Sequence, residues 1–321
     1  MMMKAAVYER YGSPEAVRVK DIPTPVPGKK ELLVKVVAST VNRTVCGFRS
    51  AEYFVSRFWS GLFRPKFPVL GCEFAGIVEE VGEEVSLFKK GDRVFGFNDE
   101  TFGGHAEYLV IAEDKAITTI PEGLSFEEAA PITEGSHYAL VNIRAANIQP
   151  GDRIMVAIGS AAVQLLKHLG TVVTAVVNTK NMGLIKSLGV DEVIDHEKED
   201  FTRIGTQAET RFSFIFDAVG KCSFKECKPL LTDKGIYVST ELGKNGENIW
   251  YALTTPLLGG KKVLFPIPTI SKADVIFLKT LVENGEFKPI IDREYPLDDI
   301  LEAYRYVETG QKTGNVILKI S

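Results

Sequence analysis

The residues with the clearest potential for chemistry surround a strand-to-helix turn in the middle of the chain. The apolar run 154–156 predicts a buried strand, and a segment with helical spacing begins at Gly159 and Ser160. A glycine at the start of a helix presents backbone N–H groups to an anion, as in turns that receive the pyrophosphate of a dinucleotide. We therefore assign Gly159 and Ser160 to a cofactor-binding site.

This turn is unusually short. Only Ala157, Ile158 and Gly159 separate the strand from the helix, and one glycine stands where the dinucleotide-binding fingerprint has three. Either about five residues were lost here, which should abolish tight cofactor binding, or the sequence as read omits a mobile loop and the numbering closes over it. We favour the omitted loop, because a glycine-rich phosphate loop readily becomes disordered when no ligand holds it.

The second predicted strand of this region ends about 19 residues after Gly159, at Asn178, Thr179 and Lys180. An NAD site usually carries an Asp or Glu at this place, which accepts a hydrogen bond from the ribose 2′-hydroxyl. The segment has no carboxylate to repel a 2′-phosphate. We therefore expect NADPH (NADP+) to be the cofactor, and we include all three residues in its site.

The elements that position this site alternate between strands and helices through the middle third of the chain. Such alternation predicts a parallel sheet with helices on both faces, which is a doubly wound α/β domain. The first third carries short β-branched runs punctuated by Gly and Pro turns, and this pattern predicts a β-rich domain. We expect the last strand, from Asn315, to pack back onto that first domain.

The composition is that of a globular protein with two domains: 321 residues, of which 45% are hydrophobic and 25% charged. The 38 basic and 42 acidic residues give a net charge of −4, so we expect no nucleic-acid partner. We find no secretory signal, no run near the ~20 apolar residues of a membrane span, and only four scattered cysteines. A cytoplasmic protein with reduced thiols is expected.

Six segments, in order along the chain, resemble motifs of the medium-chain dehydrogenase/reductase superfamily, and especially those of its zinc-independent NADPH:quinone oxidoreductases. The segments are Gly71–Gly82, Lys90–Gly96, Gly103–Tyr108, Leu188–Asp195, Phe216–Gly220 and Gly310–Val316. The resemblance implies a GroES-like β-rich catalytic domain formed by residues 1–122 and 268–321. It further implies a Rossmann domain, with a doubly wound parallel sheet, formed by residues 123–267. A homodimer and a cofactor in the cleft between the domains are implied as well.

The segment from Val41 resembles the active-site stretch of that family. The resemblance implies catalytic roles for Asn42, Arg49 and Tyr53, although Val45 stands where the family has an Asp. Asn42 would orient the nicotinamide or the substrate, and Tyr53 would hydrogen-bond a carbonyl oxygen or close the pocket. Arg49 would act beside them or brace the loop through an ion pair.

Further residues are assigned to the cofactor site from the same resemblance. His196 stands where a Tyr often lies beside the adenosine ribose, and Lys312 is near the usual place of a basic contact to the cofactor phosphate. Val219 and Thr240 lie at the ends of two later strands and complete the set. For His105, in a Gly-Gly-His-Ala-Glu segment, we expect a surface or strand-edge position rather than an acid–base role.

Zinc is the alternative to metal-free chemistry. The Gly-His-Glu segment that supplies a catalytic ligand in zinc alcohol dehydrogenases reads Gly71, Cys72, Glu73 here, and no four-Cys cluster follows residue 92. Glu134 lies near the place of a third ligand. We expect no metal, yet Cys46, Cys72 and Glu73 form an alternative ligand set, since tetrahedral zinc accepts thiolates and carboxylates.

Three functions remain open, and the first is preferred. It is NADPH-dependent reduction of a quinone or enone by hydride transfer without a metal, with the nicotinamide and the acceptor held in contact in a dry cleft. The second is a zinc-dependent alcohol dehydrogenase that uses Cys46, Cys72 and Glu73. The third is a catalytically silent member of the fold that binds a membrane, RNA or another protein, because a fold alone does not prove activity.

Overall fold

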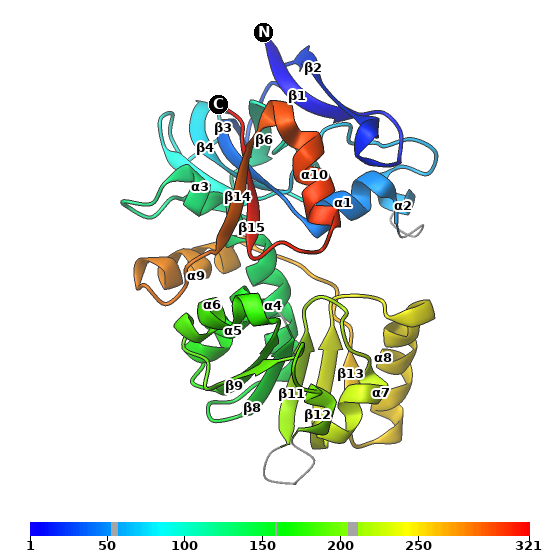
Figure 1. Cartoon of the computed structure of the whole chain (residues 1–321). Helices are drawn as coiled ribbons and strands as arrows, with labels where there is room; N and C mark the ends of the chain where they lie inside the picture. The colour runs from blue at the N-terminus through cyan, green and yellow to red at the C-terminus, as the bar shows by residue number, and fades with distance from the viewer. Residues whose placement is uncertain (53–56, 158, 205–210) are drawn as a thin grey trace. The chain divides into compact units, whose positions relative to one another are not determined.

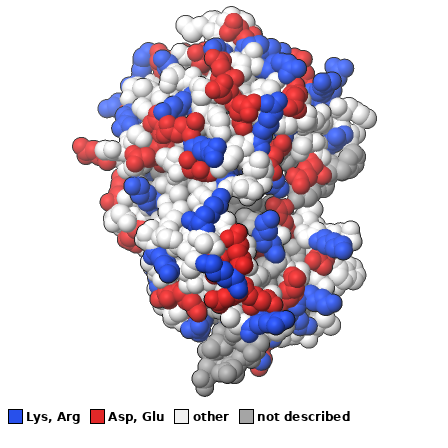
Figure 2. All heavy atoms as spheres, in the orientation of Figure 1, with Lys and Arg blue, Asp and Glu red and all other residues white. Residues whose placement is uncertain are grey.

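The computed structural model describes residues 1–52, 57–157, 159–204 and 211–321, apart from the side chain of Trp59 (Figure 1). The chain divides into two compact units: unit 1 consists of residues 1–134 and 270–321, and unit 2 of residues 135–269. Acidic and basic side chains are interspersed over the face shown in Figure 2. No helix formed by the described residues has the length and apolar character that crossing a membrane requires.

Unit 1 is built on a seven-stranded sheet whose central member is β3, an almost continuous run of apolar and β-branched residues. The sheet order is β14-β15-β3-β4-β5-β7, and β6 pairs with the first half of β3. Strands β1 and β2 form a separate antiparallel hairpin. The strands are β1 Met2–Tyr8, β2 Val17–Pro23, β3 Glu31–Val41, β4 Glu73–Val81, β5 Arg93–Phe97, β6 Tyr108–Ala112, β7 Ile117–Thr119, β14 Ile291–Pro296 and β15 Asn315–Lys319.

The C-terminal segment completes this sheet. Strand β15 pairs antiparallel with the end of β3, where Val316 lies opposite Val41. This pairing confirms the expectation that the last strand returns to the first domain. The helices of unit 1 are α1 Arg43–Ser50, α2 Arg57–Ser60, α3 Phe126–Ala129, α9 Lys272–Glu283 and α10 Ile300–Glu308, with short 3-10 turns at Pro14–Ala16, Ala130–Ile132 and Leu297–Asp299.

Unit 2 is a parallel sheet in the order β10-β9-β8-β11-β12-β13. This is the order of a dinucleotide-binding sheet, in which the direction of winding reverses between the first and fourth strands, here β8 and β11. The predicted doubly wound fold is confirmed. The strands are β8 Arg153–Ala157, β9 Val172–Val177, β10 Glu192–Asp195, β11 Phe212–Asp217, β12 Leu231–Ser239 and β13 Lys262–Leu264.

Helices join these strands and bury both faces of the sheet, so β8 and β9 are buried along nearly their whole length. One core cluster gathers side chains from every strand of the sheet and from α7, and Tyr251 and Ala252 of α8 pack against it. The helices are α4 Glu134–Ala146, α5 Ser160–His168, α6 Met182–Ser187, α7 Phe224–Cys227 and α8 Glu247–Leu258, with short turns at Thr179–Asn181, Phe201–Arg203, Lys228–Leu230 and Lys244–Gly246.

Candidate active site

The connection between β8 and α5 lies where the strand order of unit 2 reverses. Gly159 caps the N-terminus of α5, and its carbonyl accepts a hydrogen bond from the N–H of Val163 (3.0 Å). A Cβ atom on Gly159 would lie 3.0 Å from the Cβ of Ala218, in the turn after β11. Glycine therefore permits the close approach of the two turns, and Ser160, half-buried, begins the helix beside them.

Only Ile158 and Gly159 connect β8 to α5, and Ile158 lies outside the described residues. The N–H groups available to a pyrophosphate therefore come from the start of α5 rather than from a long glycine-rich loop. The omitted-loop interpretation is wrong, because the full sequence runs without a gap from Ala157 to Ser160. The short turn is a feature of the protein itself, and titration with the cofactor tests whether it still permits tight binding.

Asp217, at the end of β11, organises the second turn at this edge. Its buried carboxylate accepts hydrogen bonds from the N–H groups of Val219 (3.3 Å), Lys221 (3.1 Å) and Cys222 (3.2 Å), and from the hydroxyl of Tyr237 (3.3 Å). Burial raises the pKa of Asp217, and the backbone donors oppose that shift. This role of Asp217 was not predicted from the sequence, although a carboxylate at the end of a largely apolar strand is a visible signal.

Val219 and Thr240 both belong to this edge. Val219 is partly exposed in the turn that Asp217 holds. Thr240 donates its N–H to the carbonyl of Asp217 (3.1 Å) and its hydroxyl to the carbonyl of Ala218 (3.0 Å). Two residues assigned to the cofactor from resemblance thus lie at the carboxyl ends of parallel strands, where α/β sheets bind their ligands.

A cavity of about 570 Å³ opens at the same edge of unit 2, within the usual size range of small-molecule sites. It is bounded by the ends of β8 and β9, by the segment after β10 and by the turn after β11. The exposed His196, assigned from resemblance to the adenosine ribose, is part of its wall. The lining residues are Ala157, Val176, His196, Glu197, Lys198, Glu199, Asp200, Phe201, Lys221 and Cys222.

The end of β9 carries the three residues predicted to meet the cofactor ribose. The side-chain oxygen of Asn178 is buried and has no hydrogen-bond partner, so an acceptor is left over at this point. Thr179 donates its N–H to Glu197 (3.1 Å) and its hydroxyl to Asp195 (2.6 Å), while Lys180 is exposed. Both carboxylates come from β10 and its following segment, and only the pairing of β10 with β9 brings them to Thr179, so they were not predicted from the sequence.

These observations meet the requirements of a nicotinamide dinucleotide in unit 2. A helix N-terminus lies at the switch point, a cavity of suitable volume opens at the carboxyl edge, and an orphaned acceptor lies where a ribose hydroxyl is expected. An acceptor that is buried without a donor is costly to leave unpaired. A ribose hydroxyl is the kind of group that would satisfy it.

Asn42 in unit 1 is held within a buried hydrogen-bond network. Its side-chain oxygen caps α1 by accepting the N–H of Val45 (3.0 Å). Its amide nitrogen contacts the hydroxyl of Thr40 and the sulfur of Cys72, each at 3.3 Å. The N-cap role follows from the sequence, because Asn is among the preferred residues at that position.

Glu73 is the centre of this network. Its fully buried carboxylate accepts the hydroxyls of Thr40 (2.5 Å) and Thr133 (3.0 Å) and the N–H groups of Thr133 (3.1 Å) and Glu134 (2.7 Å). Burial raises the pKa of Glu73, and these donors act in the opposite direction. Because four donors surround it, the carboxylate is paired as a buried acid must be.

A second acid and a lysine lie beside Glu73. Burial, followed by the charge of Glu73, raises the pKa of Glu134 to about 8. Burial lowers the pKa of Lys312, and the nearby carboxylates of Glu134 and Glu73 oppose that change. The ammonium of Lys312 also donates to the carbonyl of Gly314 (2.7 Å). With its pKa raised to about 8, Glu134 holds a proton at neutral pH.

The donors around Cys72 do not make a metal centre. Burial raises the pKa of the Cys46 thiol to about 12 and that of Cys72 well above its ordinary value, so without a metal ion both thiols hold their protons. The Cys72 sulfur lies 3.5 Å from Glu134, and Glu73 is occupied by its four donors. Among the residues with a described placement, no three His, Cys, Asp or Glu side chains gather into a metal site. The alternative zinc set therefore has no support from this geometry.

Arg49 is fully buried in unit 1. Its guanidinium pairs with Glu308 of α10, donates to the carbonyl of Gly12, and lies over the ring of Tyr304, 4.9 Å from the centroid. These contacts join α1 to α10 and support the bracing role. A role for Arg49 in the reaction itself stays a prediction. Tyr53, the remaining catalytic prediction, lies outside the described residues.

His105 is not at the surface, so that part of its prediction is wrong. It is 1% exposed, and its Nε2 lies 2.8 Å from the carbonyl oxygen of Thr40, to which it donates. Burial lowers its pKa to about 4. The ring is therefore neutral at physiological pH and acts as a packing and hydrogen-bonding group. Gly71 packs directly against His105, with a φ of +91° that favours glycine. No pattern in the sequence around His105 indicates this contact, so its burial could not be predicted locally.

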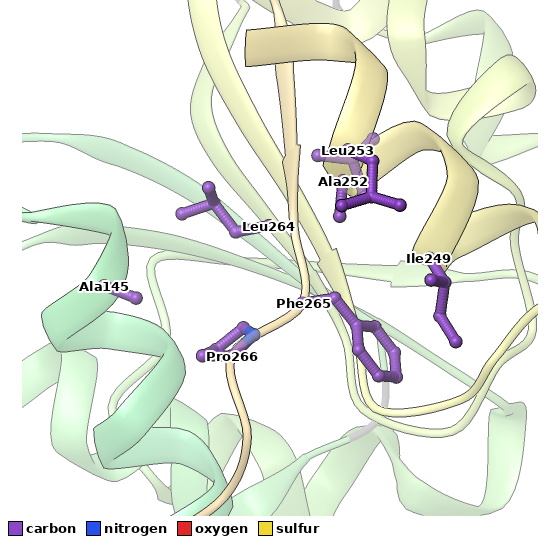
Figure 3. Close-up of a pocket in the computed structure, with 8 residues that line it drawn as sticks. Ala145, Ile249, Ala252, Leu253, Leu264, Phe265 and Pro266 are labelled. Carbon is purple, nitrogen blue, oxygen red and sulfur yellow. The ribbon is translucent and has the colours of Figure 1, made fainter.

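A second, apolar pocket of about 400 Å³ lies in unit 2 between α8 and the segment that contains β13 (Figure 3). Its walls are Ala145, Ile249, Ala252, Leu253, Val263, Leu264, Phe265 and Pro266. The side chain of Leu253 is 65% exposed, and its neighbours Trp250 and Leu257 are 66% and 86% exposed. The outer face of α8 is thus an unusually apolar surface beside the last strand of the sheet.

Comparison with known proteins gives consistent matches over the whole chain. Residues 28–122 match the alcohol dehydrogenase GroES-like domain family, and residues 188–318 match the zinc-binding dehydrogenase family. A 2-methylene-furan-3-one reductase of Solanum lycopersicum is 30% identical, over 98% of this chain and 79% of that protein.

Two further relatives extend this comparison. An NADPH-dependent alkenal/one oxidoreductase of Arabidopsis thaliana chloroplasts is 28% identical, with the same coverage of 98% and 79%. The structure of a quinone oxidoreductase from Coxiella burnetii superposes with a TM-score of 0.87 and 26% identity, over the full length of both chains.

Proposed function

The chain belongs to the medium-chain dehydrogenase/reductase superfamily as a quinone oxidoreductase-like protein, and from this we propose that it reduces quinones or other conjugated carbonyls with NADPH. The observation that carries the proposal is the carboxyl edge of unit 2. There the reversal of strand order, the α5 N-terminus and the cavity beside His196 coincide. Relatives named as NADPH-dependent alkenal/one and furanone reductases support the same class of substrate.

When bound, the nicotinamide supplies the hydride that adds to the conjugated acceptor. The protein's part is to bind and orient. The N-terminus of α5 receives the diphosphate, while Asn178 and His196 meet the adenosine ribose. Asn42 orients the nicotinamide or the acceptor, and the proton that completes the reduction comes from Tyr53 or from solvent.

NADPH rather than NADH is part of the proposal. It rests on Asn178, Thr179 and Lys180, which bring no carboxylate of their own to the end of β9. The NADPH-dependent relative adds support. A cytoplasmic location is also proposed, because all four cysteines are free thiols and reducing compartments maintain that state.

A titration of the purified protein with NADPH and with NADH, followed by cofactor fluorescence, tests this function. The intact mass, 35.4 kDa for the full chain, is measured on the same sample to show that the protein is undegraded. Micromolar binding of NADPH, followed by turnover of an enone or a quinone, supports the proposal. If the intact 35.4 kDa chain binds neither cofactor, the proposal is overturned and a silent member of the fold is favoured.

The proposed assembly is a homodimer formed through unit 2. Strand β13 is the outermost strand of the sheet, and the apolar face of α8 with its pocket lies beside it (Figure 3). A second copy would cover this apolar surface and pair with the strand edge. Light scattering during gel filtration should give twice the 35.4 kDa chain mass, and Leu257→Glu should reduce it to one chain. A monomer in the unmodified protein would contradict the dimer.

A further inference from the structure

The end of β9 offers the cofactor ribose more acceptors than donors. The N–H of Thr179 is taken by Glu197 at 3.1 Å, and its hydroxyl is taken by Asp195 at 2.6 Å. The side-chain oxygen of Asn178 adds an unpartnered acceptor. A ribose hydroxyl can donate to such groups, whereas a 2′-phosphate needs donors and positive charge.

The two carboxylates differ in how firmly they are placed. Asp195 has a side chain only 4% exposed, and it accepts the Thr179 hydroxyl and the N–H of Glu197 (3.1 Å) and pairs with Lys198 (3.3 Å). It is therefore an internal part of the β10 turn. Glu197 is exposed, and its carboxylate reaches back to a single backbone N–H.

The position of Glu197 matters because the N–H of Thr179, to which it is hydrogen-bonded, lies at the strand end where dinucleotide-binding folds recognise the ribose 2′ substituent. While Glu197 occupies it, a 2′-phosphate loses this donor and meets a like charge. The nearby cations Lys198 and Lys221 lie in the same cavity wall, together with Glu199 and Asp200, so the loop as a whole carries both signs.

We propose that Glu197 is a specificity-determining residue, whose carboxylate competes with the 2′-phosphate of NADPH for the N–H of Thr179 and so narrows the preference for NADPH over NADH. The inference rests on the proposed function, because it requires the cofactor ribose to bind at the carboxyl edge of unit 2. Glu197 belongs to the segment that follows β10, whereas the end of β9 carries no carboxylate.

Calorimetric titration with 2′,5′-ADP and with 5′-AMP tests the inference, because these two ligands differ by the 2′-phosphate and need neither hydride transfer nor the nicotinamide. Glu197→Gln should strengthen binding of 2′,5′-ADP about tenfold, since a like charge next to the phosphate is removed. Binding of 5′-AMP should stay the same or weaken. The same ratio should appear in the dissociation constants of NADPH and NADH.

Glu199→Gln is the matched control. It removes the same charge from the same loop and the same cavity wall, but Glu199 takes no part in the Thr179 contacts described above. It should change the ratio of the two affinities less than about twofold, because exposed charges at a distance are screened. Both residues are exposed, so both variants should fold, which thermal melting checks.

Three results would overturn the inference, and they are distinguishable. An unchanged affinity ratio in Glu197→Gln shows that the charge of this carboxylate does not oppose the phosphate, and an unchanged ratio in Glu197→Ala, which also removes the acceptor, shows that the side chain does not compete for the N–H of Thr179. Equal changes in both variants show that the net charge of the loop, not the Thr179 contact, sets the ratio. If the unmodified protein binds neither nucleotide nor NADPH, the proposed function itself fails and the inference falls with it.

Discussion

Both units contain a fully buried carboxylate that is surrounded by hydrogen-bond donors, Glu73 in unit 1 and Asp217 in unit 2, but the two acids join different parts of the chain. Glu73 in unit 1 accepts hydrogen bonds from Thr40, Thr133 and Glu134, which are 33, 60 and 61 residues away along the chain. Asp217 in unit 2 accepts three N–H groups that lie within five residues of it. The buried carboxylate of unit 1 therefore closes the tertiary fold, whereas the backbone donors of the carboxylate in unit 2 all belong to one turn.

The surroundings of the two acids differ as well. Glu73 faces Glu134 and Lys312 in a network that is complete within unit 1. Asp217 lies beneath an edge where exposed charged residues line a cavity. We infer that the unit 1 network is fixed before any ligand arrives, whereas the edge of unit 2 is the part of the molecule that substitutions can retune.

The largest effect is expected for Glu73→Ala. The substitution removes the acceptor of two backbone N–H groups and two hydroxyls in a fully buried place, so it should lower the free energy of unfolding by about 3–5 kcal/mol. Equilibrium unfolding in urea measures it. Glu79→Ala, which removes an exposed partner of Lys90, serves as the control and should leave the midpoint in place. Equal losses in the two variants would show that Glu73 does not close the fold.

A smaller effect is expected for Asp217→Asn. An amide nitrogen would face one of the N–H donors, so the turn should loosen and stability should fall by about 1–3 kcal/mol. NADPH binding, measured by titration, should weaken along with it, because Val219 lies in that turn. Asp233→Asn, at a 94% exposed side chain, is the control. A loss of stability without any loss of cofactor affinity would separate the turn from the cofactor site.

The third prediction concerns pH and Glu134. Its folded pKa, about 8, is above the ordinary value of 4.5, so the folded state holds a proton that the unfolded chain releases. The stabilisation is complete below pH 4.5 and is lost as pH rises toward 8, with a slope of up to about 1.4 kcal/mol per pH unit. Urea unfolding from pH 5 to pH 8 measures the slope, and Glu134→Gln should flatten it. An unaltered slope in that variant would assign the effect to another group.

The smallest effect on stability is expected for an exposed ion pair, which serves as the reference for the two buried carboxylates. Lys20 and Glu9 form an ion pair at 2.6 Å, but both side chains are largely exposed. Lys20→Met should leave the melting temperature unchanged within about 1 °C, because exposed pairs are screened by solvent and salt. Differential scanning calorimetry at low and high salt checks this. A fall in melting temperature as large as that of Asp217→Asn would mean that the burial of an interaction does not determine how much it stabilises the fold.

Much of the site could be anticipated from local sequence. The start of α5 at Ser160, the Asn178–Lys180 strand end and the exposed place of His196 follow from patterns that span a few residues. Asn42 as an N-cap is likewise a local property. The hydrogen-bond partners of these residues could not be predicted from the sequence. Thr179 donates to Asp195 and Glu197 only because β10 lies next to β9 in the sheet.

The sequence by itself determined the family, the alternation of strands and helices and the positions of the strand ends, because each depends on side-chain periodicity and on short motifs. Only the tertiary structure decided which charges share a site. It paired Glu73 with Glu134 and Lys312, buried His105 against Thr40 and brought Glu197 to Thr179. The physical reason is that these energies depend on distance and burial in space, which residues far apart along the chain acquire only when the sheets form.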